Sequence, residues 1–156
     1  MARGTFALDI TVDDLGLQDL VGKLEPAGIK GVLKNIGEEG VQLTLKAFRD
    51  QRNPDTGKKW APLKPETIKR RRGTGTVPLQ RTRELRNSFH WELVDGGSAV
   101  SIGTPYPFFK YHQHLPENAH LDHHIMPRRE AFPNQQPLPK PWATGFLDAV
   151  ESYLDL

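Results

Sequence analysis

The order of hydrophobic and polar positions predicts where the strands and helices of this chain lie. Residues 5–12, TFALDITV, alternate between apolar and polar types, which is typical of a strand with one buried face. Residues 26–50 carry apolar side chains at helical spacing and predict one long helix that begins at Pro26. The C-terminal residues predict another helix, whose apolar face holds Ala143, Phe146, Leu147, Val150, Tyr153 and Leu154.

The long helix carries two apolar stripes instead of one. The first stripe consists of Ile29, Val32, Leu33, Ile36, Leu43 and Ala47. The second stripe, on nearly the opposite side, consists of Val41, Leu45 and Phe48. A helix with one buried face needs only one stripe, so we expect either a bend near Gly37 and Gly40 or a second covering surface. We predict that a neighbouring subunit or the segment around Trp60 covers the second stripe.

The middle of the chain predicts short elements separated by turns. A short helix is expected from about residue 15 to 24, and another begins at Pro65 after the turn signals Asn53-Pro54 and Gly57. A helical turn over RTRELRNSF leads to a hairpin of residues 89–94 and 99–102. After PYPFFKYHQHL, a long irregular Pro- and His-rich stretch follows to Pro141. This order predicts an α+β fold in one domain, residues 1–156. A small, mostly antiparallel sheet packs against the long helix and the C-terminal helix, with long loops between elements.

Composition limits the class of protein. The chain has 156 residues, 37% of them hydrophobic, and no cysteine, which excludes disulfides and thiolate metal sites and fits an intracellular origin. No apolar run approaches the roughly 18 residues of a membrane-spanning helix. The first residues show no signal-peptide pattern, so we expect neither secretion nor a membrane partner.

Charge is distributed unevenly along the chain. Residues 58–86 contain ten Lys or Arg and two Glu, a net charge of +8, and the total of +2 therefore leaves −6 for the rest. Such segregation suits head-to-tail self-association or docking on an acidic protein. The same basic residues can bind DNA phosphates without sequence specificity, or form a merely solvated helix face. Trp60, between Lys59 and Pro62, favours a packed segment, either in its own core or in a neighbour's groove.

Five histidines fall within thirteen positions and are the strongest candidate metal ligands. His112, His114, His120, His123 and His124 offer imidazoles, with Glu117 or Asp122 nearby as a carboxylate for a metal-dependent hydrolase. Their spacing matches no established metal motif, so a surface loop rich in histidine is the preferred interpretation. The serines lack a nucleophile elbow and the glycines lack a phosphate-binding pattern. We therefore expect no catalytic residue, no cofactor and no bound metal.

Several separated motifs, in this order, resemble the phage virion morphogenesis family. They are FRDQRNPDTGKKWAPLKPETIKRRR, LQRTRELRNSFHWEL, AVSIGTPYPFFKYHQHL and IMPRREAF, followed by an amphipathic helix, and they extend from Phe48 to about Tyr153. The chain departs from the family pattern at Arg83, where glycine is usual, at His114-Leu115, and at Glu130, where proline is usual.

The resemblance implies a non-enzymatic structural protein of a tailed-phage virion. Members of this family look like tail-completion, terminator or neck subunits that act late in assembly at the head–tail joint. They are expected as a ring, often six-fold, around the DNA channel, in the virion and earlier in the host cytoplasm. The implied partners are other copies, other neck or tail proteins and, non-specifically, the genomic DNA. The expected partner-binding residues are Lys58, Lys59, Trp60, Lys69, Arg70, Arg71, Arg72, Val41, Leu45 and Phe48.

Overall fold

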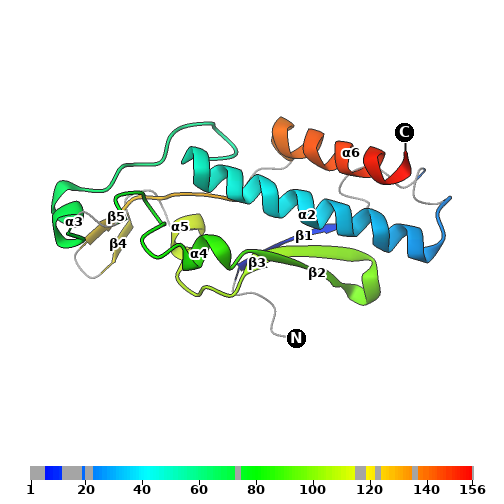
Figure 1. Ribbon diagram of the computed structural model, residues 1–156, viewed down its shortest axis with the longest axis horizontal. Helices are drawn as coiled ribbons and strands as arrows, with labels where there is room; N and C mark the ends of the chain where they lie inside the picture. Colours follow the sequence, from blue (N-terminus) through cyan, green and yellow to red (C-terminus); the bar gives the residue numbers. More distant parts are fainter. Residues whose placement is uncertain are drawn as a thin grey trace.

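A long helix crosses a small antiparallel sheet, and a second long helix lies on the other side of the first (Figure 1). The computed structural model describes residues 6–11, 19, 23–72, 75–114, 119–121, 124–134 and 137–155. The helices are α2 (Pro26–Asp50), α3 (Pro65–Arg70), α4 (Glu84–Asn87), α5 (Phe109–His114) and α6 (Lys140–Leu154). The strands are β1 (Phe6–Thr11), β2 (His90–Val94), β3 (Ala99–Thr104), β4 (Ala119–Leu121) and β5 (His124–Met126). These elements confirm the α+β prediction.

The main sheet has the strand order β1-β3-β2, and both neighbouring pairs are antiparallel. In the register of the sheet, Ile102 stands opposite Leu8 and Trp91, and Val100 stands opposite Ile10 and Leu93. Because side chains alternate along a strand, these apolar residues share the face that packs on α2. The hairpin of β2 and β3, joined by a 3₁₀ turn (Asp95–Gly97), confirms the predicted hairpin.

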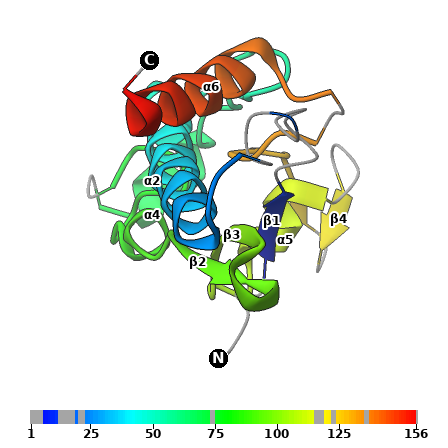
Figure 2. The same ribbon diagram turned by 90° about the vertical axis from the view of Figure 1, so that its right-hand side faces the viewer.

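The helix α2 lies close to the sheet because two of its buried positions are glycines. A methyl group at Gly37 would lie 2.7 Å from the Trp91 ring, and one at Gly40 would lie 2.2 Å from Cδ1 of Ile102. The opposite side of α2 is covered by α6, so the helix is buried from two sides (Figure 2). The glycines therefore mark close packing of α2 on the sheet, and α6 covers another side of the same helix.

A chain of aromatic rings, most of them packed edge-to-face, fills the core beside the C-terminal half of α2. Phe48 contacts Trp60 and Phe89, each with ring centroids 5.4 Å apart. The series continues through Phe109, Phe132, Trp142 and Phe146, all buried. Such ring pairs add about 0.5–1.5 kcal/mol each beyond the apolar area that they bury. These contacts join α2, α5 and α6 in one hydrophobic core.

Two predictions for the C-terminal third need correction. The buried face of α6 consists of Trp142, Phe146 and Val150, whereas Leu147 and Tyr153 are 43% and 40% exposed. The stretch from residue 116 to Pro141 is not wholly irregular, because it contains the β4–β5 hairpin. The short helix predicted from residue 15 to 24 falls mostly outside the described residues. In the described part of the chain, no helix is long and apolar enough to cross a lipid bilayer.

Candidate assembly surface

A tight reverse turn follows α2 and begins the basic segment. The side-chain oxygen of Asn53 accepts hydrogen bonds from the backbone N–H groups of Asp55 and Thr56, at 2.7 and 3.1 Å. Gly57 has a φ of 69°, in the left-handed region that suits glycine. The N–H of Trp60 then donates to the carbonyl of Gln51 at 2.7 Å and closes the turn. The turn predicted at Asn53-Pro54-Asp55 is confirmed.

Trp60 anchors this segment to the protein's own core. Its indole is 6% exposed, packs edge-to-face on Phe48 and donates a hydrogen bond from Nε1 to the carbonyl of Glu130 at 2.8 Å. Phe48 itself is fully buried. The expectation that Trp60 and Phe48 contact a partner is therefore corrected, because each is covered by the other and by neighbouring side chains of the same chain. The Trp60 segment is what covers the Phe48 end of the second stripe.

Arg129 holds the same segment from its other side. Its guanidinium is 6% exposed and donates from Nε to the carbonyl of Ala61 at 3.0 Å and from Nη2 to that of Pro62 at 3.3 Å. Burial, and to a smaller extent the charge of Arg71, lower the pKa of Arg129. The planar fork of arginine donors suits two adjacent carbonyls. The loop between Trp60 and α3 is thus fixed by a residue that lies 68 positions after Ala61 in the sequence.

Gln113 joins α5 to the 131–134 segment through a buried polar network. Its Nε2 donates to the carbonyl of Phe132 at 2.7 Å and to the side-chain oxygen of Asn134 at 3.0 Å. Its Oε1 accepts from the N–H groups of Ala131 and Phe132 at 3.1 and 3.3 Å. The sequence predicted no role for Gln113 or Arg129. In the sequence, only their positions in the motifs YHQH and PRREAF indicated that these two residues could have a role.

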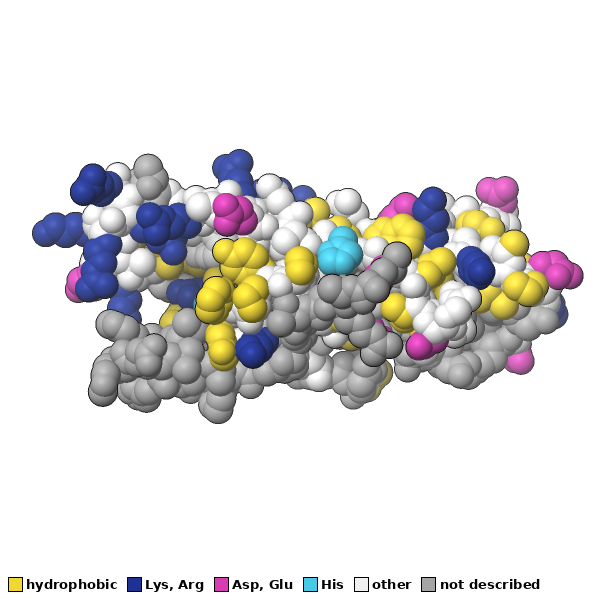
Figure 3. Space-filling model, turned by 90° about the horizontal axis from the view of Figure 1, so that it is seen from below, with side chains coloured by type: hydrophobic (Ala, Val, Ile, Leu, Met, Phe, Trp, Pro, Cys, Tyr) yellow, Lys and Arg dark blue, Asp and Glu magenta, His cyan; other side chains and the backbone are white. Residues whose placement is uncertain are grey.

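These contacts support a cluster of basic side chains at one end of the molecule, called here the basic end: Lys58, Lys59, Lys69, Arg70, Arg71 and Arg72. All six are exposed except Arg71, which is half-buried and donates from Nη1 to the carbonyl of Gly75 at 2.6 Å. Helix α3 stops at Arg70 and Arg72 has a φ of 51°, so the predicted basic helix through Arg72 ends two residues early. Basic side chains gather over α3, and acidic ones lie mainly toward the opposite end (Figure 3).

An aromatic hollow lies beside the basic end, and we call it the Phe108 pocket. It has a volume of about 330 Å³, and its lining includes Arg71, Leu79, Arg81, Tyr106, Phe108 and His112. Phe108 is 63% exposed, and its ring lies 6.3 Å from that of Tyr106. Glu84 lies on the same lining, so the pocket carries two arginines against one carboxylate. Figure 3 shows apolar side chains gathered over α4 and α5, next to basic ones.

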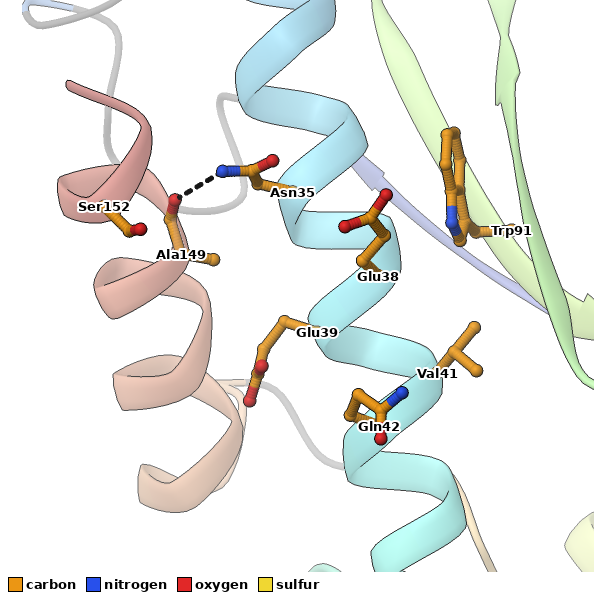
Figure 4. A pocket seen from close by; sticks show the side chains of 8 residues that line it. All are labelled: Asn35, Glu38, Glu39, Val41, Gln42, Trp91, Ala149 and Ser152. Carbon is orange, nitrogen blue, oxygen red and sulfur yellow. Dashed lines mark hydrogen bonds between the residues drawn. The ribbon is translucent and has the colours of Figure 1, made fainter.

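Val41, another residue of the second stripe, borders an acidic groove. Val41 and Leu45 are half-buried, and Val41 lines a groove of about 510 Å³ between α2, α6 and β2 (Figure 4). Glu38 and Glu39 lie along this groove, with the Trp91 ring on the β2 side. Asn35 donates from Nδ2 to the carbonyl of Ala149 at 3.3 Å and joins the two helices. The groove therefore has a charge opposite to that of the basic end.

The histidines are only partly described. His112 lies half-buried on the lining of the Phe108 pocket. Burial lowers the pKa of His112 to about 4, and the charge of Arg129 contributes to the same shift. A hydrogen bond to the Pro127 backbone has a smaller, raising effect on this pKa. The backbone of His114 lies in α5, and His120 and His124 belong to β4 and β5. His123, Glu117 and Asp122 lie outside the described residues. Within the described residues, no group of three or more His, Asp or Glu side chains is placed to hold a metal ion.

Comparison with known families gives one match. A sequence model of the phage virion morphogenesis family matches residues 10–132, which cover most of the chain from β1 to the Phe132 segment. The match ends before α6, so that helix lies outside the part shared with the family description. Comparison with curated proteins and with solved structures gives no match.

Proposed function

Since the chain belongs to the phage virion morphogenesis family, we propose that it is a structural subunit of the head–tail joint in a tailed phage. Membership of this family indicates a structural or assembly role for the chain in a phage. The finer proposal is a tail-completion, terminator or neck subunit that acts late in assembly, as a six-fold ring around the DNA channel. In this proposal the protein needs no cofactor, and it performs no catalysis.

The observation that carries this proposal is the basic end held on a rigid support. The turn at Asn53 and the buried indole of Trp60 fix the chain on both sides of Lys58 and Lys59. Arg129 fixes residues 61 and 62, just before α3 and the other four basic residues. A segment that is already ordered loses little conformational entropy when it docks. An assembly protein that must join two large structures benefits from such a preformed contact surface.

A protein partner is favoured over DNA as the target of the basic end. The charge outside residues 58–86 is −6, so a neighbouring copy brings its own acidic surface to the contact. DNA in the channel is the second candidate, because exposed lysines and arginines also bind phosphates. Different measurements distinguish the two targets. If the basic end contacts a protein, its loss should stop the joining of heads and tails. If it contacts phosphates, its loss should change how strongly the protein retains duplex DNA and how that binding depends on salt.

The proposal predicts that a phage carrying Lys69→Ala, Arg70→Ala and Arg72→Ala produces unattached heads and tails. These three side chains are exposed, so the variant protein should keep its fold, and Arg71 is spared because it also bonds to Gly75. Electron microscopy of the lysate and a count of infectious particles measure the effect. The control removes three exposed charges elsewhere, with Lys23→Ala, Lys34→Ala and Lys140→Ala, and should assemble normally. Normal numbers of joined particles from the first variant would refute the assembly role of the basic end.

A further inference from the structure

We propose that the Phe108 pocket of one copy receives the acidic outer face of α6 from a second copy. This inference rests on the proposed function, because it assigns the contact between neighbouring subunits of the ring. The outer face of α6 consists of Leu147, Asp148 and Glu151, all exposed. The proposed contact would place the Leu147 side chain of one copy against Phe108 of the other. The carboxylates of Asp148 and Glu151 would then lie beside Arg71 and Arg81.

Exposed apolar side chains identify the two surfaces. Among the described residues the large hydrophobic side chains that stay exposed are Phe108, Leu147 and Tyr153. Phe108 lies at one surface, and the other two belong to α6. An exposed aromatic ring over an apolar hollow is the kind of residue that dominates the energy of a protein interface. Both surfaces therefore have apolar area that the isolated chain does not bury.

The charges around these apolar groups are opposite in sign. The Phe108 pocket carries Arg71 and Arg81 against Glu84, and the basic end continues from it through Arg72. Leu147 is followed by Asp148, and Glu151 lies one helical turn further on the same side. Complementary charge orients two surfaces and excludes wrong partners, which is why a second copy fits this pocket better than an unrelated apolar segment.

A single chain cannot make this contact with itself. The helices α4 and α5, which frame the pocket, lie beneath α2, while α6 lies above it (Figures 1 and 2). The two surfaces are therefore on opposite sides of one molecule, and each copy offers one of them to each neighbour. Such a heterologous contact repeats from subunit to subunit and gives a closed ring when its rotation closes.

Thiol cross-linking tests the contact directly, because the chain has no cysteine of its own. Thr82→Cys, on the lining of the pocket, and Thr144→Cys, one helical turn before Leu147, are prepared as separate variants. Both positions are exposed, and neither change removes an apolar or charged side chain of the proposed contact. Phage particles that contain a mixture of both variants are treated with a short bismaleimide. The expected product is a covalent dimer from the mixture and none from either variant alone. A mixture of Lys34→Cys with Thr144→Cys is the control and should give no dimer.

Any other cross-linking result would contradict the proposed contact between the Phe108 pocket and α6. A dimer from Thr82→Cys alone would mean that identical surfaces meet, and no dimer from the mixed particles would mean that these surfaces are apart. If the particles assemble without cross-linking, this interface is wrong and the proposed function stands. If heads and tails join normally in a phage that lacks the protein, the proposed function itself fails.

A charge exchange provides the second test. Arg81→Glu and Glu151→Arg should each weaken association of the purified protein at least about tenfold in sedimentation experiments, because like charges then face each other. The double variant should recover most of the loss, since the pair is reversed and not removed. A double variant as weak as the two single changes combined would contradict the pairing of these surfaces.

Discussion

Buried polar side chains decide how the family motifs fit together. Gln113 makes four hydrogen bonds to the 131–134 segment, and Arg129 bonds to the carbonyls of residues 61 and 62. Both residues are at most 6% exposed, so water cannot replace these bonds in a variant. Their partners lie up to 68 residues away in the sequence. A pattern of hydrophobic and polar positions does not reveal such pairs, which is why sequence reasoning left both residues without a role.

Gln113→Leu should lower the free energy of unfolding by about 3 kcal/mol. Leucine fills a similar volume but removes all four hydrogen bonds that Gln113 makes to the backbone of Ala131 and Phe132 and to the side chain of Asn134. Urea unfolding measures the loss. Gln42→Leu, at an exposed position of α2, is the matched control and should change stability by less than about 0.5 kcal/mol. Equal stability of the two variants would show that the Gln113 network contributes nothing.

His112 should make the fold less stable in acid. Its pKa is about 4 in the folded protein, below the ordinary 6.5, so the unfolded chain binds the proton more tightly. The stabilisation is therefore complete above about pH 6.5 and is lost as the pH falls toward 4, by at most about 3 kcal/mol. His112→Gln should flatten this part of the curve of unfolding free energy against pH. If the variant and the wild type lose the same stability between pH 7 and pH 4, the histidine does not titrate in this way.

At the scale of elements, hydrophobic periodicity located α2 with its observed bounds but did not reveal what covers it. The pattern of residues 26–50 showed two stripes. In the structure the sheet and α6 cover two sides of α2, and the Trp60 segment covers the Phe48 end of the second stripe. In α6, apolar residues occur on more than one face. The helical period therefore predicted that Leu147 and Tyr153 are buried, whereas the structure buries Trp142 and leaves those two exposed. Short strands such as β4 and β5 have too few residues for a period to be recognised.

Gly37→Ala should destabilise the protein by about 1–2 kcal/mol although alanine is the better helix former. The added methyl group would meet the Trp91 ring at 2.7–2.8 Å and Val100 at 2.9 Å, and overpacking of this kind outweighs a gain in propensity of about 1 kcal/mol. Gly28→Ala, which meets only the Leu24 side chain, should stay within about 0.5 kcal/mol of the wild type. Thermal unfolding of both variants measures the difference. A more stable Gly37→Ala protein would mean that α2 does not lie this close to the sheet.

At the scale of the whole molecule, the sequence predicted the segregation of charge, and the fold separates the charges in space. Basic side chains gather over α3, and acidic side chains lie mainly toward the other end (Figure 3). The sequence could not show that Trp60 is bound within its own chain, because an apolar residue in a polar segment fits a core and a partner equally well. The packing of Trp60 on Phe48 and its hydrogen bond to the carbonyl of Glu130 show that it belongs to the core of its own chain.

The most direct test of the central claim is an electron cryo-microscopy reconstruction of the head–tail joint in intact virions. Our account predicts a ring of copies of this chain at the joint, with the basic end of each copy against the acidic surface of its neighbour. Absence of this chain from the joint of complete, infectious virions would contradict the account.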